Sequence, residues 1–393
     1  MTQASIMNTY GRLPVSFCRG EGAYLYDENG KQYLDAIAGI GVNALGHSHP
    51  AVSDAIATQA NTLIHTSNLY RIEKQEKLAE LLCGISDMER VFFANSGAEA
   101  NEAAIKIARL YGHNKGVKKP RTIVVEGSFH GRTMATLSAT GNRKIQAGFE
   151  PLVAGFVRAP YNDITALEKI AENNSDVVAI LVEPILGEGG VVVPDSNYLR
   201  ALRELCDKHQ WLLMLDEVQT GNGRTGSYFA YQGCDILPDV VTTAKGLGNG
   251  VPIGACLARG EAANTLQPGN HGSTYGGNPL ACATALAVVH TISSEKLCDH
   301  AASMGKLIID SLTEGLCDCK ALIEVRGRGL MIGVELDREC GELVSLALEQ
   351  GLLINVAAGY TIRMLPPLII SAEQATELAD KVCSLVLNFV NNP

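Results

Sequence analysis

The sequence predicts an α/β protein, with a mostly parallel sheet covered by helices on both faces and a smaller α+β unit built from both ends of the chain. The first observation is a set of four apolar or β-branched runs of strand length, at 121–126, 177–183, 211–216 and 240–244. The second is that the longer segments between them have helical spacing, a pattern typical of a parallel sheet buried on both faces. The third is a change of order beyond about residue 300, where strands follow one another before a final helix.

The segments that flank these strands have recognisable turn and cap residues. Residues 22–35 alternate in polarity and turn at Asn29-Gly30, which predicts a hairpin. Asn278 followed by Pro279 predicts the start of a helix rich in small residues that runs to Ile292, because Asn is a good N-cap and Pro suits the first helical position.

The C-terminal part predicts strands at 326–336, 352–356 and 361–365. Ser371, with Gln374 three residues later, predicts a capping box at the start of a last helix that reaches about Val390. At 393 residues the chain is too long for one simple core. We therefore expect three parts: an N-terminal segment that packs with the small domain at 1–50, a large domain at 51–300, and a C-terminal small domain at 301–393.

Composition excludes several classes of function. The formal charge is −10 and no basic stretch offsets it, so we expect no nucleic acid and no membrane among the partners. The eleven cysteines lack the spacing of a metal site or disulfide framework, so we expect no metal, and free thiols in a reducing cytosol. The N-terminus lacks the basic and apolar segments of a secretion signal, and no apolar run approaches the ~20 residues of a membrane span. These features predict a cytoplasmic protein.

Two strand ends carry an acid and a lysine. The run that begins at Trp211 ends in Asp216, and the run that begins at Val240 leads to Lys245. Pyridoxal phosphate requires both groups, because its aldehyde forms a Schiff base with a lysine and its pyridine nitrogen needs a carboxylate to stay protonated. Two solvated charges at strand ends would explain the same pattern, so the pair needs support from other segments.

A helix N-terminus supplies a candidate phosphate site. Ser96 and Glu99 form the pattern of a capping box after the apolar run that begins at Val91. The backbone N–H groups of Gly97 and Ala98 would then be free to bind an anion. A capped helix that binds no ligand is the simpler interpretation of this motif taken alone.

Two further strand ends have candidate functional residues. Phe129, His130 and Arg132 follow the strand at 121–126, and an aromatic ring beside an arginine there could stack on a flat ring and bind a carboxylate. Glu183 and Glu188 follow the strand at 177–183. Ligands of open α/β sheets bind at the carboxyl ends of the strands, so these residues favour one shared site.

Other motifs permit competing interpretations. Gly221–Gly226 fits the G-x-G-x-x-G pattern of a dinucleotide site, but no helix of the required kind follows it. His47 and His49 resemble a metal pair, yet no acid or cysteine lies at ligand spacing, so a turn is the better interpretation. The loop at 272–277 could contact a phosphate or could simply pack.

Together these segments resemble the class III pyridoxal-phosphate aminotransferases of fold type I. The resemblance extends from the turn that begins at Leu45 to the strand that ends at Arg363, with the motifs in order. It implies a large cofactor domain with a seven-stranded, mostly parallel sheet, a small domain from both termini, and a homodimer.

The resemblance also implies roles for individual residues. Lys245 would be the catalytic residue that forms the Schiff base with pyridoxal 5'-phosphate. The other cofactor-binding residues would be Asp216 at the pyridine nitrogen, Gln219 near the phenolic oxygen, Phe129 on the ring, Gly97 and Ala98 at the phosphate, and Thr274 of the partner subunit at the same phosphate.

Four residues would bind substrate. Arg132 matches the arginine that binds the α-carboxylate, and Ser273 would lie near the substrate. Glu188 and Arg363 match a pair that acts as a switch: while paired they admit a chain with a terminal amine, and once Glu188 moves away Arg363 can bind the second carboxylate of glutamate or 2-oxoglutarate.

The reaction that the resemblance implies is transfer of the δ-amino group of N2-acetylornithine to 2-oxoglutarate. Family members that use free ornithine have a tyrosine at the position that corresponds to Ile40, and its absence favours an acylated amine. Succinylornithine, N-succinyl-diaminopimelate, free ornithine and 4-aminobutyrate remain alternatives within the class. An aminomutase and a protein that keeps only the fold are alternatives from other classes.

Overall fold

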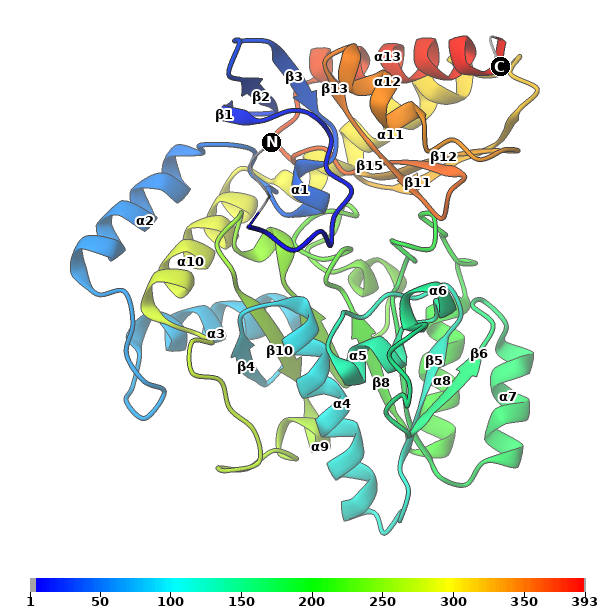
Figure 1. Cartoon of the computed structure of the whole chain (residues 1–393). Helices are drawn as coiled ribbons and strands as arrows, with labels where there is room; N and C mark the ends of the chain where they lie inside the picture. The colour runs from blue at the N-terminus through cyan, green and yellow to red at the C-terminus, as the bar shows by residue number, and fades with distance from the viewer. Residues whose placement is uncertain (1–4, 392–393) are drawn as a thin grey trace.

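The computed structural model describes residues 5–391, and its central element is a seven-stranded sheet (Figure 1). Residues 1–4, part of the segment that predicted no secretion signal, and residues 392–393 lie outside this range. The strands run in the order β4 (Arg90–Ala94), β10 (Gly254–Ala258), β9 (Val240–Thr243), β8 (Leu212–Asp216), β7 (Val177–Val182), β5 (Arg121–Val125) and β6 (Phe156–Ala159). Only β10 is antiparallel to its neighbours, so the other six strands end at one edge. This confirms the predicted α/β class and the four predicted strands.

Both faces of the sheet are buried, because successive strand residues point to opposite sides. In β8, Leu212 and Met214 pack with the alanine-rich helix α4 (Gly97–Asn114). Leu213 and Leu215 pack into the larger core on the other face, which includes side chains of α8 (Tyr198–His209) and α10 (Pro279–Ser294). Small side chains such as Ala103 and Ala104 let α4 approach the sheet closely and cross several strands.

The remaining helices before residue 297 include several that connect or contact strands of the large sheet, one at 50–62 that packs against α10, and one short turn at 38–41 that follows the N-terminal hairpin. They are α1 (Ala38–Gly41), α2 (Pro50–Thr62), α3 (Glu73–Ser86), α5 (Met134–Ala139), α6 (Arg143–Gln146), α7 (Ile164–Asn173) and α9 (Gly260–Ala263). The predicted helix after Asn278 is confirmed: Asn278 caps α10 by accepting a hydrogen bond from the N–H of Ala281 at 2.9 Å, and the helix ends at Ser294.

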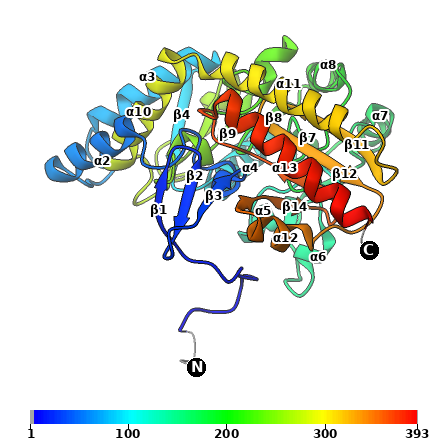
Figure 2. The same cartoon turned by 90° about the horizontal axis from the view of Figure 1, so that it is seen from above.

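Strands and helices from the N-terminal and C-terminal parts of the chain lie together above the large sheet (Figure 1). One small sheet contains β1 (Phe17–Glu21), β2 (Tyr24–Asp27), β3 (Gln32–Asp35) and β13 (Leu352–Leu353). A second contains β11 (Leu322–Arg328), β12 (Met331–Leu336), β15 (Thr361–Met364) and β14 (Asn355–Ala357). Helices α11 (Leu297–Gly315), α12 (Leu343–Glu349) and α13 (Ala372–Asn391) pack with these sheets, and α11 and α13 lie side by side in Figure 2. The domain limits at residues 50 and 300 stay a prediction.

Two of the predicted C-terminal strands were wrong in detail. The expected single strand at 326–336 is the second half of β11 and the whole of β12, joined by a turn in which Gly329 has a φ of 55°. The expected strand at 352–356 is divided between two sheets, since Leu352 pairs with β3 and Asn355 pairs with β15. The capping box was right: Gln374 N–H donates to Ser371 Oγ at 3.2 Å, and Ser371 N–H donates to Gln374 Oε1 at 2.9 Å.

A strained turn lies between the N-terminal hairpin and α2. Residues 38–41, which form α1, all have positive φ, and Ile40 has a φ of 65°. A β-branched residue in the left-handed region is costly and persists only where its surroundings fix it. Asp35 holds one side of this turn in place, because its Oδ1 accepts hydrogen bonds from the N–H groups of Ile37 and Ala38. The other carboxylate oxygen lies 2.8 Å from Nε2 of His47. The backbone of His47 pairs with Gly22 in an isolated β-bridge, and the chain bends only at Ser48, where φ is 54°.

Ile40→Gly is expected to raise the free energy of unfolding by about 1 kcal/mol, because glycine adopts the left-handed conformation without the clash of a Cβ. Little packing is lost, since Ile40 is 42% exposed. The matched control is Ile323→Gly, at an exposed isoleucine in the extended strand β11, where glycine is expected to destabilise the protein. Urea unfolding of both variants measures the difference, and equal losses would contradict strain at Ile40.

No helix among residues 5–391 is long and apolar enough to cross a membrane.

Candidate active site

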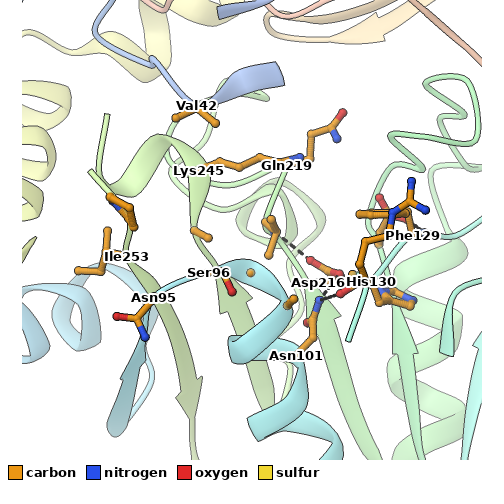
Figure 3. A pocket seen from close by; sticks show the side chains of 18 of the residues that line it. Val42, Asn95, Ser96, Asn101, Phe129, His130, Asp216, Gln219, Lys245 and Ile253 are labelled. Carbon is orange, nitrogen blue, oxygen red and sulfur yellow. Dashed lines mark hydrogen bonds and ion pairs between the residues drawn. The ribbon is translucent and has the colours of Figure 1, made fainter. Parts of the chain in front are cut away.

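A cavity of about 380 Å³ lies at the edge where the parallel strands end (Figure 3). Its walls come from the segments that follow β4, β5, β7, β8 and β9, and Val42 adds a wall from the N-terminal segment. Seven of the predicted site residues line it: Gly97, Ala98, Phe129, Arg132, Asp216, Gln219 and Lys245. Residues far apart in the sequence therefore converge as the strand order requires.

The N-terminus of α4 forms one wall of this cavity. Ser96 is the N-cap and accepts a hydrogen bond from the N–H of Glu99 at 3.2 Å, while the Glu99 carboxylate accepts from the N–H of Asn95. Within the described chain, the N–H groups of Gly97 and Ala98 have no hydrogen-bond acceptor. A Cβ at Gly97 would lie only 2.7 Å from Cγ1 of Val218, so glycine is needed where the helix meets the segment after β8. The helix thus offers two free donors and its positive dipole to an anion.

Asp216 lies at the end of β8, and neighbouring donors fix its carboxylate (Figure 3). Its Oδ2 lies 2.7 Å from Nδ1 of His130 and accepts a hydrogen bond from Nδ2 of Asn101 at 2.7 Å. Its Oδ1 accepts from the N–H of Val218 at 3.1 Å. Thr242 in turn donates to Oδ1 of Asn101, which orients that amide. The carboxylate is buried, and these contacts hold both of its oxygens in place.

Phe129 and Arg132 lie at the mouth of the cavity, in the turn that follows β5. The guanidinium carbon of Arg132 lies 5.7 Å from the centre of the Phe129 ring. Arg132 is exposed and makes no ion pair with any residue between 5 and 391. A free guanidinium beside an aromatic face can bind a carboxylate, as the sequence suggested.

Lys245 follows β9, and its backbone has an unusual φ of 44°. Asn222 fixes the strand end just before it, because its amide donates to Oγ1 of Thr243 and to the carbonyl of Ala244. The glycine motif at 221–226 therefore serves to support Lys245. Burial lowers the pKa of Lys245; the charge of Glu188 opposes this effect, and that of Arg363 adds to it. No residue in the described range forms a hydrogen bond or ion pair with its Nζ, so the amine is available for chemistry.

Glu188 and Arg363 form an ion pair beside this lysine. Nη1 of Arg363 donates to Oε1 of Glu188 at 2.6 Å and to Oε1 of Gln219 at 3.3 Å. Burial raises the pKa of Glu188, but the charge and hydrogen bond of Arg363 outweigh it and leave that pKa below its ordinary value. Arg363 is only 1% exposed, whereas the Glu188 side chain is 37% exposed. The structure thus brings together the two residues that the sequence predicted as a pair.

Ser273 and Thr274 lie elsewhere. They line a neighbouring cavity of about 460 Å³, and Asn95 lines both cavities. Nδ2 of Asn95 donates to Oγ of Ser273 at 3.2 Å, which links the two. Thr274 is exposed and does not reach the main cavity of its own chain.

Glu183 adds a second buried carboxylate to the cavity wall. Its Oε1 accepts a hydrogen bond from the N–H of Phe129, and its Oε2 accepts from the N–H of Gly187. Burial, helped by the charge of Asp216, nevertheless raises its pKa to about 7. The charge of this wall therefore changes near neutral pH.

Glu183→Gln is expected to change how stability depends on pH. A carboxyl whose pKa is higher in the folded chain binds more protons when folded. Its contribution to stability is thus fully present below the unfolded pKa near 4.5 and is lost as the pH rises through about 7. Glutamine cannot ionise, so the variant does not lose this contribution. As the pH rises from 5 to 8, the free energy of unfolding of the variant should therefore increase by about 2 kcal/mol relative to that of the parent.

Urea unfolding at several pH values tests this expectation. Glu168→Gln, at an exposed position on α7, is the control and should give a difference that does not vary with pH. If the free energy of unfolding of Glu183→Gln also differs from that of the parent by the same amount at every pH, the raised pKa of Glu183 is contradicted.

Sequence reasoning did not assign the roles of three residues of the site. Asn101 is a buried polar residue on an alanine-rich helix face, and that contrast could have drawn attention to it. His130 was named among the residues after the strand at 121–126, but not as a partner of Asp216. Val42, and not Ile40, is the residue of the N-terminal turn that lines the cavity, because the left-handed turn leaves Ile40 exposed.

Known proteins share this architecture and much of the sequence. A family model described as Aminotransferase class-III matches residues 6–386. The acetylornithine aminotransferase of Nitrosomonas europaea is 54% identical over 387 residues, which cover 98% of each chain. A structure of ornithine aminotransferase from Toxoplasma gondii, with PLP at partial occupancy in its active site, has a TM-score of 0.93 and 35% identity and covers 97% of this chain and 92% of that chain. The acetylornithine aminotransferase structure from Elizabethkingia anophelis has a TM-score of 0.87 and 34% identity over 97% of this chain and 96% of that chain.

Proposed function

Because this chain belongs to the class-III aminotransferases and is a pyridoxal-phosphate-dependent transaminase, we propose that it transfers the δ-amino group of N2-acetylornithine to 2-oxoglutarate. The products are N-acetylglutamate 5-semialdehyde and glutamate. The observation that carries the substrate assignment is the ion pair between buried Arg363 and partly exposed Glu188, beside Lys245. While the two residues are paired, the site is neutral and suits an amine substrate. When Glu188 moves away, the charge of Arg363 becomes available to the second carboxylate of a dicarboxylate. The names of the relatives support the same substrate.

The residues of the cavity fit pyridoxal phosphate. The free N–H groups at the start of α4 suit its phosphate, the fixed carboxylate of Asp216 suits its pyridine nitrogen, and the unpartnered amine of Lys245 suits its aldehyde. Phe129 would cover the ring, and Gln219 would lie at its phenolic edge. When bound, the cofactor withdraws electrons from the substrate carbon that bears the amine.

The chain's own side chains would position the substrate and move its proton. Arg132 would bind the α-carboxylate at the mouth of the cavity, whereas Ser273 lies in the neighbouring cavity and is linked to this one through Asn95. The lowered pKa of Lys245 lets a larger fraction of Nζ be neutral, so it can accept the proton from the substrate carbon and return it.

The Arg363–Glu188 pair would let one site bind the different substrates of the two half-reactions. While paired, it presents no net charge to the acylated amine substrate. Glu188, which is the more exposed partner, would move out when the second carboxylate of 2-oxoglutarate binds Arg363. A buried cation without a partner is costly, so the exchange of one carboxylate for another keeps Arg363 satisfied throughout.

The proposal includes a homodimer and a cytoplasmic location. Thr274 is exposed, lines the neighbouring cavity, and would reach the phosphate site of a second copy. Several apolar side chains near this loop are also exposed, among them Leu69 and Tyr70, and a second copy would cover them.

Free ornithine is a second candidate, because the Toxoplasma structure is an ornithine aminotransferase. Val42 argues against it, since the only side chain from its segment that lines the described cavity is apolar and offers no hydrogen bond to a free α-amino group. The test is to compare kcat/KM of the purified holoenzyme for acetylornithine, succinylornithine, N-succinyl-diaminopimelate, ornithine and 4-aminobutyrate with 2-oxoglutarate as acceptor. A clear preference for acetylornithine is expected, and a preference for any other amine would overturn the assignment. Turnover without 2-oxoglutarate would indicate an aminomutase.

A further inference from the structure

Besides Glu188 and Gln219, Arg363 has a third side-chain partner, Asn355, which sequence reasoning did not find. Asn355 lies directly opposite it in the antiparallel pairing of β14 with β15. Oδ1 of Asn355 accepts a hydrogen bond from Nη2 of Arg363 at 2.8 Å. Nη1 faces the other way, toward Glu188 and Gln219, and Nε has no partner among the described residues. The guanidinium is therefore held from two sides by different kinds of acceptor.

The two sides differ in charge. Glu188 is a carboxylate and neutralises the guanidinium, whereas the amide oxygen of Asn355 satisfies an N–H group and leaves the positive charge in place. A carboxylate at position 355 would neutralise Arg363 permanently. A buried arginine would then gain little from a ligand carboxylate, because its charge would already be compensated.

The two sides also differ in mobility. Asn355 belongs to a strand whose backbone pairs with the strand of Arg363, so it moves with the arginine. Glu188 lies in the segment between β7 and α8 and is partly exposed, so it can turn toward solvent. When Glu188 leaves, the hydrogen bond of Asn355 still fixes the plane of the guanidinium, and Nη1, which keeps Gln219 as a partner, has one N–H free for a ligand.

We propose that Asn355 is a positioning residue that keeps Arg363 oriented and its charge available, and that it thereby determines whether the site binds the distal carboxylate of a dicarboxylate acceptor. This inference rests on the proposed function, because it assigns Arg363 to that carboxylate. Asn355 would not affect the amine substrate, which binds while Glu188 and Arg363 are paired.

The experiment measures ligand binding and both half-reactions on the holoenzyme. Calorimetry gives the dissociation constants of glutarate, an unreactive dicarboxylate, and of valerate, a monocarboxylate of the same length. The preference for glutarate is the ratio of the dissociation constant of valerate to that of glutarate. Asn355→Asp is expected to lower this ratio by at least about tenfold, and Asn355→Ser by a smaller factor. KM for 2-oxoglutarate should rise in parallel, while single-turnover reaction with acetylornithine stays within about threefold.

Three comparisons decide the outcome. Asn29→Asp makes the same chemical change in an exposed turn and should keep the glutarate preference of the parent. If Arg363→Ala loses that preference and both Asn355 variants keep it, the inference is overturned and the proposed function stands. If Arg363→Ala keeps the preference, the proposed dicarboxylate site fails and the inference fails with it. Equal losses in both half-reactions with a lower Tm would assign Asn355 a merely structural role and overturn the inference.

Discussion

Lys245→Ala is expected to lower transaminase turnover by about 10⁴-fold, because it removes the only amine that lines the described cavity. No other residue there can bind the aldehyde or exchange a proton at the same position. The fold should persist, since the Nζ makes no hydrogen bond in the described chain and Asn222 still fixes the preceding strand end. Steady-state rates with acetylornithine and 2-oxoglutarate measure the loss.

Small primary amines give this variant a sharper test. Alanine leaves room in the cavity, so methylamine should restore part of the rate of the proton-transfer step if Lys245 acts as the base. Lys144→Ala, at an exposed position on α6, is the control and should turn over normally. Turnover of Lys245→Ala within about tenfold of the parent would rule out the catalytic role.

Asp216→Asn is expected to lower kcat for both half-reactions by about 10²- to 10³-fold. The substitution keeps the shape of the side chain but removes the negative charge opposite the pyridine nitrogen. The carboxylate is now surrounded by groups of His130, Asn101 and Val218. The amide of asparagine would place its own NH₂ donor opposite at least one of them, so that hydrogen bond would be lost. Rapid-mixing measurements of each half-reaction separate this effect from weaker substrate binding.

The matched control for this second variant is Asp310→Asn, at an exposed position on α11. It should leave both half-reactions unchanged. If Asp216→Asn affects KM alone and leaves kcat intact, the carboxylate serves substrate binding and its assigned place at the pyridine nitrogen is wrong.

The sequence predicted most of the cavity because the site residues follow buried strands. Parallel strands bring their carboxyl ends to one edge wherever they lie in the chain, so Phe129, Asp216 and Lys245 could be assigned to a common place without knowing the strand order. The capping pattern at Ser96 predicted the helix start for a local reason, since its donors and acceptors lie within four residues.

Contacts across the sheet could not be predicted in this way. Asn101 reaches Asp216 only because α4 crosses β8, and nothing in the spacing of the two residues indicates that crossing. Asn355 faces Arg363 through a strand pairing whose register depends on the turn between β14 and β15. The sequence predicted a single strand at 352–356, whereas the two halves of this run pair in different sheets. The pairing of Asn355 with Arg363 could therefore not be predicted from it.

The division of that run has a consequence for biosynthesis. The N-terminal strands complete their sheet by pairing β3 with β13, and the N–H of Leu34 donates to the carbonyl of Gly351. Within this sequence, β3 is therefore translated some three hundred residues before its partner strand β13. A nascent chain that has not reached Leu353 cannot complete this sheet, so the sheet from which the Val42 segment continues is completed only late in synthesis.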